Sequence, residues 1–405
     1  MNQFRNLLFF AWIAVAFLLW QAWSTEHAAQ TPAATVATTQ PAAASGTAAA
    51  VPAATIPGAT AHANAPAARS VRGPTISLRN DVLALELDGR AITRADLLRF
   101  PKSRAPGAAP VVLLDPTPAT FFEASAAWIA SDGTDLAFRP LDASRSFTLA
   151  PGQQDVTARF EATTASGLRV QRSITLDRGS YAVRIHDSLV NTGSGTWIGD
   201  IQRRLVRLPA VTGRSFFNPE TISLNGAAWY SPKDKYEKRR YPDFAKDGPL
   251  NQEVRGGWIG LSQHYFLAAW IPERDQGALF SLSERGHQYE VDARGPQVTL
   301  TTGQRFTTTT TLWVGPKVAH DLDAVAPGLG LSLDYGIFTA IAKPIHWLLT
   351  QLHKLTGNWG WAIVLLVLLI KLLLYPLSAK QYQSMAKMRK FQPRIQQLKE
   401  RYGDD

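Results

Sequence analysis

The chain has 405 residues, of which 45% are hydrophobic, and a formal net charge of +10. It contains no cysteine, which excludes disulfides, thiolate metal sites and a cysteine nucleophile. From Lys343 to the C-terminus there are ten Lys and Arg residues and three acidic residues, so +7 of the net charge of +10 lies at one end of the chain. This uneven distribution argues against a nucleic-acid-binding domain, whose basic residues are normally spread over one folded surface.

Residues 1–27 are expected to form an N-terminal transmembrane signal anchor. Arg5 precedes a run from Leu7 to Trp23 that carries no charge. A cleaved signal peptide is the alternative, but the run is long for a signal peptide and residues 24–27 make a poor cleavage site. With Arg5 in the cytoplasm, the residues after the anchor would lie outside it.

Residues 28–72 consist almost entirely of Ala, Thr, Pro, Gly and Ser. They carry too little large apolar surface to repay the entropy of ordering, which predicts a flexible linker.

Residues 73–327 contain short β-type runs separated by turns. Between residues 159 and 190, for example, three runs are divided by turns at Ser166-Gly167 and at 177–180. About 250 residues of this texture predict one large antiparallel β-sandwich. The mixed charges of 233–248 favour a solvated loop, with a partner site as the alternative.

Residues 331–356 are expected to form an amphipathic helix, because apolar residues recur at spacings of three and four from Ile337 to Leu355. The helix could dock on the sandwich or lie in the membrane interface. The short break at Gly357-Asn358 before the next apolar run favours the interface.

Residues 358–377 are expected to form a second transmembrane helix. From Trp359 to Leu377 the chain is apolar except for Lys371, and about 19 residues suffice to cross a hydrocarbon core. The Lys and Arg that follow place residues after about 378 in the cytoplasm. They also suit contact with anionic headgroups. The sequence of residues 378–405 predicts a helix, a break near Pro393, and a second helical segment.

Lys371 lies about 9 Å from the cytoplasmic end of this span. A lysine at that depth can extend its ammonium group to the headgroups. Alternatively, it faces a water-filled cavity in the inner leaflet, which is the usual suspicion for an ionisable group inside a span. Position alone leaves both possibilities open.

No enzyme is expected. His186, Asp187, Glu253 and His264 are isolated in the β-rich region, and no HExxH, GxSxG or paired-carboxylate spacing occurs. The sequence therefore predicts no catalytic residues, no cofactor and no metal site.

The stretch NWGWAIVLLVLLIKLLLYPLSAKQYQSMAKMRKFQPRIQQLKERYGDD, with the anchor, the linker and the β-rich region before it, resembles the N-terminal portion of the Gram-negative YidC/Oxa/Alb family of membrane protein insertases. The resemblance implies a bacterial inner-membrane protein with its N-terminus in the cytoplasm and a periplasmic β-super-sandwich. It also implies an interfacial helix and further spans that enclose a hydrophilic groove.

The resemblance implies the following roles. Lys371 would be the groove cation, at a position where the family usually has Arg, so the planar two-pronged donor is lost. Residues 378–405 would begin a cytoplasmic helical hairpin. Substrate or headgroup contacts would be made by Lys380, Met385, Lys387, Met388, Arg389 and Lys390.

The implied activity is assistance in the insertion, folding and assembly of integral membrane proteins, alone or with the Sec translocon. The expected partners are newly made membrane proteins, Sec components and membrane lipids, but no nucleic acid. Because the sequence ends at Asp405, before the remaining spans, we expect a partial form that would not insert substrates by itself. The alternative is a membrane-tethered periplasmic interaction module.

Overall fold

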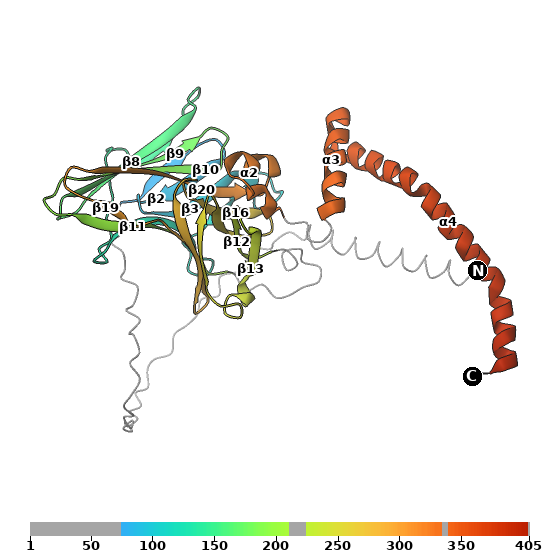
Figure 1. Ribbon diagram of the computed structural model, residues 1–405. Coiled ribbons are helices and arrows are strands. Elements are labelled where there is room, and N and C mark those ends of the chain that lie inside the picture. Colours follow the sequence, from blue (N-terminus) through green and yellow to red (C-terminus); the bar gives the residue numbers. More distant parts are fainter. Residues whose placement is uncertain (1–73, 210–223, 334–338, 404–405) are drawn as a thin grey trace, which may run out of the picture. The chain divides into compact units, whose positions relative to one another are not determined.

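The structure, a computed structural model, describes residues 74–209, 224–333 and 339–403. The expected signal anchor and linker lie outside the described residues. The expected fold class is confirmed: two β-sheets form a sandwich, and helices follow it in the chain (Figure 1).

Within the described residues the sandwich has an eleven-stranded and a nine-stranded sheet. The path through the larger sheet, in spatial order, is β14 (Leu250–Arg255), β17 (Gly277–Arg285), β18 (Gln288–Arg294), β11 (Trp197–Arg207), β5 (Phe122–Ala130), β3 (Ala91–Pro101), β2 (Leu83–Leu87), β1 (Ile76–Arg79) and β7 (Ser146–Thr148). Off this path, β19 (Val298–Leu300) pairs with β11, and β4 (Pro110–Leu114) pairs with β3.

The smaller sheet runs, in spatial order, β13 (Lys235–Arg240), β12 (Gly226–Ser231), β15 (Trp258–Ser262), β16 (Phe266–Ile271), β20 (Arg305–Pro316), β10 (Ala182–Asn191), β9 (Leu168–Asp177), β8 (Asp155–Thr163) and β6 (Arg139–Pro140). The strands that contact one another pair antiparallel, except that β1 and β7 are parallel. A 3-10 helix, η2, spans Tyr241–Asp243.

The three runs predicted between residues 159 and 190 are strands β8, β9 and β10, with turns where the sequence indicated them. In β10, Val183 and Ile185 are buried while Arg184 and His186 are exposed. This alternation turns one face of the strand toward the core. Four fully buried indoles, from Trp128, Trp258, Trp270 and Trp313, fill much of that core.

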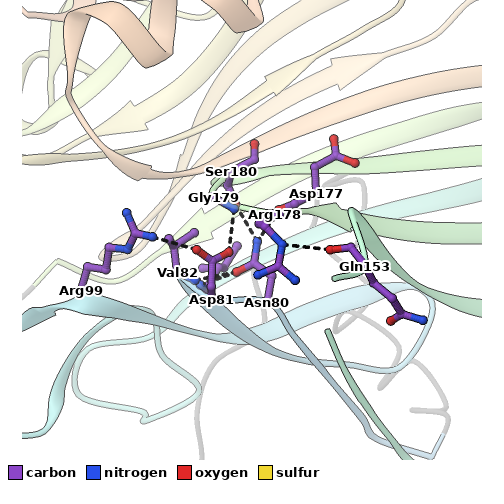
Figure 2. A network of polar contacts seen from close by, with 10 residues as sticks. Asn80, Asp81, Val82, Arg99, Gln153, Asp177, Arg178, Gly179 and Ser180 are labelled. Carbon is purple, nitrogen blue, oxygen red and sulfur yellow. Dashed lines mark hydrogen bonds and ion pairs between the residues drawn. The ribbon is translucent and has the colours of Figure 1, made fainter. Parts of the chain in front are cut away.

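A polar network ties the two sheets together at one end (Figure 2). Asn80, in the β1–β2 turn, donates through Nδ2 to the carbonyls of Asp177 and Ser180, which flank the β9–β10 turn. Asp81 accepts from the Gly179 amide at 2.6 Å and from Arg99 at 2.7 Å. Although desolvation raises the pKa of Asp81, these interactions outweigh it and hold the pKa below its usual value. The network therefore weakens as this carboxylate is protonated at low pH.

Arg172 and Asp187 form a buried ion pair between opposite positions of β9 and β10. The guanidinium donates from Nε and Nη2 to the two carboxylate oxygens at 2.7 and 2.6 Å. Its Nη1 donates to the carbonyls of Ala126, in strand β5 of the other sheet, and of Gly89, in the β2–β3 turn of that sheet. The indole of Trp128 donates to Asp187 at 2.8 Å. Every charge in this pair is thus compensated, and the pair links the two sheets.

Arg203 is also buried, but it is poorly compensated. Its Nε donates to Thr310 Oγ1 at 2.7 Å, while Nη2 has no hydrogen-bond partner among the described residues. Desolvation lowers its pKa from 12.5 to about 10. Arg203 remains charged at neutral pH and weakens the fold.

Helix α2 (Ala319–Val325) and the 3-10 helix η3 (Leu329–Ser332) follow β20 and pack on the sandwich. Leu322, Ala326 and Leu329 join the hydrophobic core. Gly328 has φ of +72°, and a Cβ there would lie 2.5 Å from the ring of Tyr230. Only glycine therefore suits this close approach.

Helix α3 (Thr339–Thr356) and helix α4 (Trp359–Tyr402) are joined by an elbow, Gly357 and Asn358. Gly357 has φ of +65°, which ends α3 with little strain. Asn358 Oδ1 accepts from the Gly360 amide at 2.8 Å and caps α4. The rings of His353 and Trp359 stack across the elbow with centroids 3.7 Å apart.

Helix α4 continues for 44 residues, through Pro376 and Pro393. The break expected near Pro393 is therefore wrong. A proline costs about 3 kcal/mol inside a helix, but the Arg, Gln, Lys, Glu and Leu residues around it are strong helix formers.

The two buried arginines should respond oppositely to replacement. Arg172→Met leaves Asp187 buried and unpaired, so we expect the free energy of unfolding to fall by about 3–5 kcal/mol. Arg203→Met removes a charge whose burial costs on the order of 3 kcal/mol, but it leaves Thr310 without its partner. We expect the free energy of unfolding to stay unchanged or to rise by up to ~2 kcal/mol.

Denaturant unfolding of the detergent-solubilised chain, followed by tryptophan fluorescence, measures both effects. If both variants lost the same free energy of unfolding, the two arginines would be equally well compensated, which would contradict the difference in their hydrogen bonds.

The elbow gives a second prediction. Asn358→Ala removes the cap and should cost about 1 kcal/mol locally, whereas Asn358→Asp keeps an acceptor and serves as the control. With spin labels at Lys343→Cys and Val364→Cys, the distribution of distances between α3 and α4 should broaden in Asn358→Ala only. An unchanged width in that variant would mean that the cap does not hold the elbow.

Candidate functional site

Helix α4 exposes large apolar side chains in almost every direction. Among the described residues, Trp359–Met388 is the one helical stretch long and apolar enough to cross a membrane. A helix that is apolar all round belongs in a core or a bilayer. Among the described side chains of α4, only Ala362 and Leu366 are buried. Because α3 is the one described element that makes extensive contact with α4, these two residues mark the side that packs on α3.

Lys371 is exposed in the middle of this apolar stretch. It is the only charged residue from Trp359 to Leu377. Ala362 precedes Lys371 by nine residues, or about 180° around a helix. Lys371 therefore lies on the face of α4 opposite the one that packs on α3.

Three further side chains share the face of Lys371. Tyr375, Ser378 and Tyr382 follow it at spacings of four, three and four, which align on one side of a helix. Both tyrosines are largely exposed. Together with Lys371 they form a row of polar groups, which we call the Lys371 face. Its spacing was readable in the sequence, but only the lysine was predicted as a site residue.

The structure separates the other predicted contact residues. Met385 continues the Lys371 face, whereas Lys380 and Lys387 lie about 180° and 160° from Lys371 around the helix. Met388 is exposed between these two faces. Arg389 and Lys390 lie on the helical backbone, but their side chains are outside those that the structure describes.

The β-sandwich offers no comparable constellation among the described residues. Asp187 is paired with Arg172 in the buried ion pair. His186 hydrogen bonds to Thr309 on the exposed face of the sheet. Glu253 lies in β14 and His264 in the β15–β16 turn, which are separate elements of the fold. No group of three or more His, Asp or Glu suited to a metal occurs within the described part of the chain.

The described surface also has a cavity of about 550 Å³, whose lining does not include His186, Asp187, Glu253 or His264. It is lined by Thr134, Asp135, Leu136, Ala137, Arg139, Pro140, Leu141, Glu161, Thr163, Thr164 and Ala165.

Two family models match the chain. Residues 75–348 match the YidC periplasmic domain, and residues 351–405 match the 60Kd inner membrane protein family. Solved structures resemble the sandwich only weakly. A galactose mutarotase-like protein from Lactobacillus casei covers 60% of this chain and all of its own, with 8% identity and a TM-score of 0.38, too low to carry an argument.

Curated relatives align over the whole chain. A protein of Stenotrophomonas maltophilia (strain R551-3) named membrane protein insertase YidC is 45% identical over 421 residues, covering 100% of this chain and 73% of the relative. One of the same name from Xanthomonas campestris pv. campestris (strain 8004) is 42% identical over 433 residues, covering 100% and 74%. The chain therefore belongs to the YidC family of inner-membrane proteins with a periplasmic domain.

Proposed function

We propose that this chain takes part in membrane protein insertion, with newly made integral membrane proteins as its substrates. Membership of the YidC family supports the class of activity. The observation that carries the mechanism is a single cation, Lys371, exposed within an apolar helix on the face turned away from α3.

The proposed topology has the N-terminal anchor (residues 1–27) and α4 as spans. The linker (28–72) and sandwich (73–327) lie in the periplasm, and α3, which falls within the expected helical region 331–356, lies in the outer interface. Supporting this, α3 exposes Ile341, Ile345 and Trp347, as an interfacial helix would. The span would occupy residues 358–377, and residues 378–405 would begin a cytoplasmic hairpin.

The mechanism needs no covalent step. A substrate that carries an acidic segment must take charge into the bilayer, at about 2.5–3.5 kcal/mol for an Asp at the centre of a helix. Lys371 lowers this cost by pairing with the carboxylate. The hydroxyl groups of Tyr375, Ser378 and Tyr382 offer hydrogen bonds along the same face, while the substrate's apolar segment moves into lipid.

The cytoplasmic part of α4 would then receive substrates or bind lipid. Lys380 and Lys387 are exposed, as are the flexible side chains of Met385 and Met388. Together with Arg389 and Lys390 they suit anionic headgroups and apolar substrate segments. We also propose that the protein works either alone or beside the Sec translocon.

Lys371→Leu tests the mechanism. In the full-length protein, at equal membrane levels, we expect insertion of substrates with acidic exported segments to fall on the order of tenfold, because the pairing charge is lost. Substrates with neutral exported segments should be inserted nearly as before. Protease protection of the exported segment measures both.

Two variants serve as controls. Lys371→Arg keeps the charge and should retain most insertion. Adding Leu373→Lys to Lys371→Leu restores a cation at nearly the same depth, but about 160° around the helix, and should not rescue. Rescue by the added Leu373→Lys replacement, or unchanged insertion in Lys371→Leu, would remove the Lys371 face from the mechanism.

A further inference from the structure

The sandwich exposes few large apolar side chains, and they are unevenly placed. Within the described part of the sandwich and its α2–η3 segment there are five: Leu141, Leu279, Tyr265, Val318 and Leu331. Three of these, Tyr265, Val318 and Leu331, lie on the segment from Lys317 to Ser332 or directly beside it. The amide of Lys317 donates to the Tyr265 carbonyl at 2.8 Å, which holds the β15–β16 turn against this segment. We call these three side chains and their supports the α2–η3 surface.

Covalent continuity keeps this surface close to α3. Ser332, the last residue of η3, and Thr339 are seven residues apart, so the end of η3 lies within roughly 25 Å of the start of α3 whatever the path between them. Helix α3 is in turn joined to the apolar helix α4 by the two-residue elbow. If α3 lies in the interface, the α2–η3 surface is tethered within this distance of lipid.

Charged groups near the surface are almost balanced. Ring contacts from Tyr265 to Phe266 (6.4 Å) and from Phe266 to Phe100 (5.8 Å) bring the end of β3 to this turn. The exposed loop after β3 carries Lys102 and Arg104. With Lys317 this gives three cations in these neighbouring segments, against the two carboxylates of α2, Asp321 and Asp323.

The chemistry of this surface fits a bilayer better than a charged partner. Tyrosine is enriched at membrane interfaces, where its ring is apolar and its hydroxyl group is hydrated. Flanking lysine and arginine can reach lipid phosphates while their stems lie along apolar groups. A tether of this length also gives lipid a far higher effective concentration than any protein in solution.

We propose that the α2–η3 surface is a membrane-contact surface of the periplasmic domain, in which Tyr265, Val318 and Leu331 enter the headgroup region of the outer leaflet. The near balance of charge means that contact is mainly apolar and depends only weakly on anionic lipid. This inference rests on the proposed topology, but not on insertase activity or on Lys371.

The chain has no cysteine, so single labels can be placed without background. Tyr265→Cys and Val318→Cys, each carrying an environment-sensitive fluorophore, test the surface in the full chain reconstituted into phosphatidylethanolamine–phosphatidylglycerol vesicles with headgroup-quencher lipids. Leu141→Cys and Leu279→Cys are matched controls, because their exposures of 48% and 40% bracket the 44% of Val318. We expect roughly twofold stronger quenching at 265 and 318 than at either control, since interfacial groups lie within reach of the headgroups.

A second measurement tests whether the apolar side chains drive the contact. In a chain labelled at Leu331→Cys, the double replacement Tyr265→Ser and Val318→Ser should reduce quenching of the label. Both replaced side chains are exposed, so the sandwich should keep its stability.

Three outcomes would overturn the proposal. Equal quenching at 265, 318 and the controls would show that the surface does not meet lipid. A disulfide that forms readily between Val318→Cys and Ile345→Cys, with no quenching at 318, would show that α3 covers it. A label at Leu373→Cys that escapes acyl-chain quenchers would overturn the membrane placement of α4, and the proposed function would fail with it.

Discussion

The organising constraint of this chain is the cost of leaving the apolar side chains of α4 in water. They point in nearly all directions, and within the described structure only α3 covers any of them. A hydrocarbon environment removes these side chains from water, and a continuous helix forms its backbone hydrogen bonds internally there. A charge in such a helix is expensive, so the position of Lys371 demands a compensating partner or access to water. The elbow and α3 then decide which way that charge faces.

The sandwich is stabilised independently of this constraint and without disulfides. Buried indoles fill the space between its sheets, and Arg172 joins β9 to carbonyls of the opposite sheet through a fully compensated ion pair. Arg203 shows the contrary case, a buried charge with one good partner. The domain thus holds one fully compensated buried arginine and tolerates the cost of another.

Local patterns predicted much of this architecture. Alternation and turn residues located strands β8 to β10, and the apolar run located α4. The ion pair cannot be found in this way, because Arg172 and Asp187 meet only through the register of β9 and β10. The break near Pro393 was mispredicted because a strong helical context outweighed one proline. The apolar length of the span does not indicate the Lys371 face, which follows only from the periodicity of its few polar groups.

The two-residue elbow also fixes a rotational phase. Since α3 joins α4 through Gly357 and Asn358 alone, the face of α4 that packs on α3 is set by where that connection ends. Each residue added to α4 between its cap and Lys371 would turn the lysine by about 100° around the helix. Helix α3 thereby acts as an angular reference for a charge about 18 Å further along α4. The length of this segment, as much as its composition, determines what the lysine can meet.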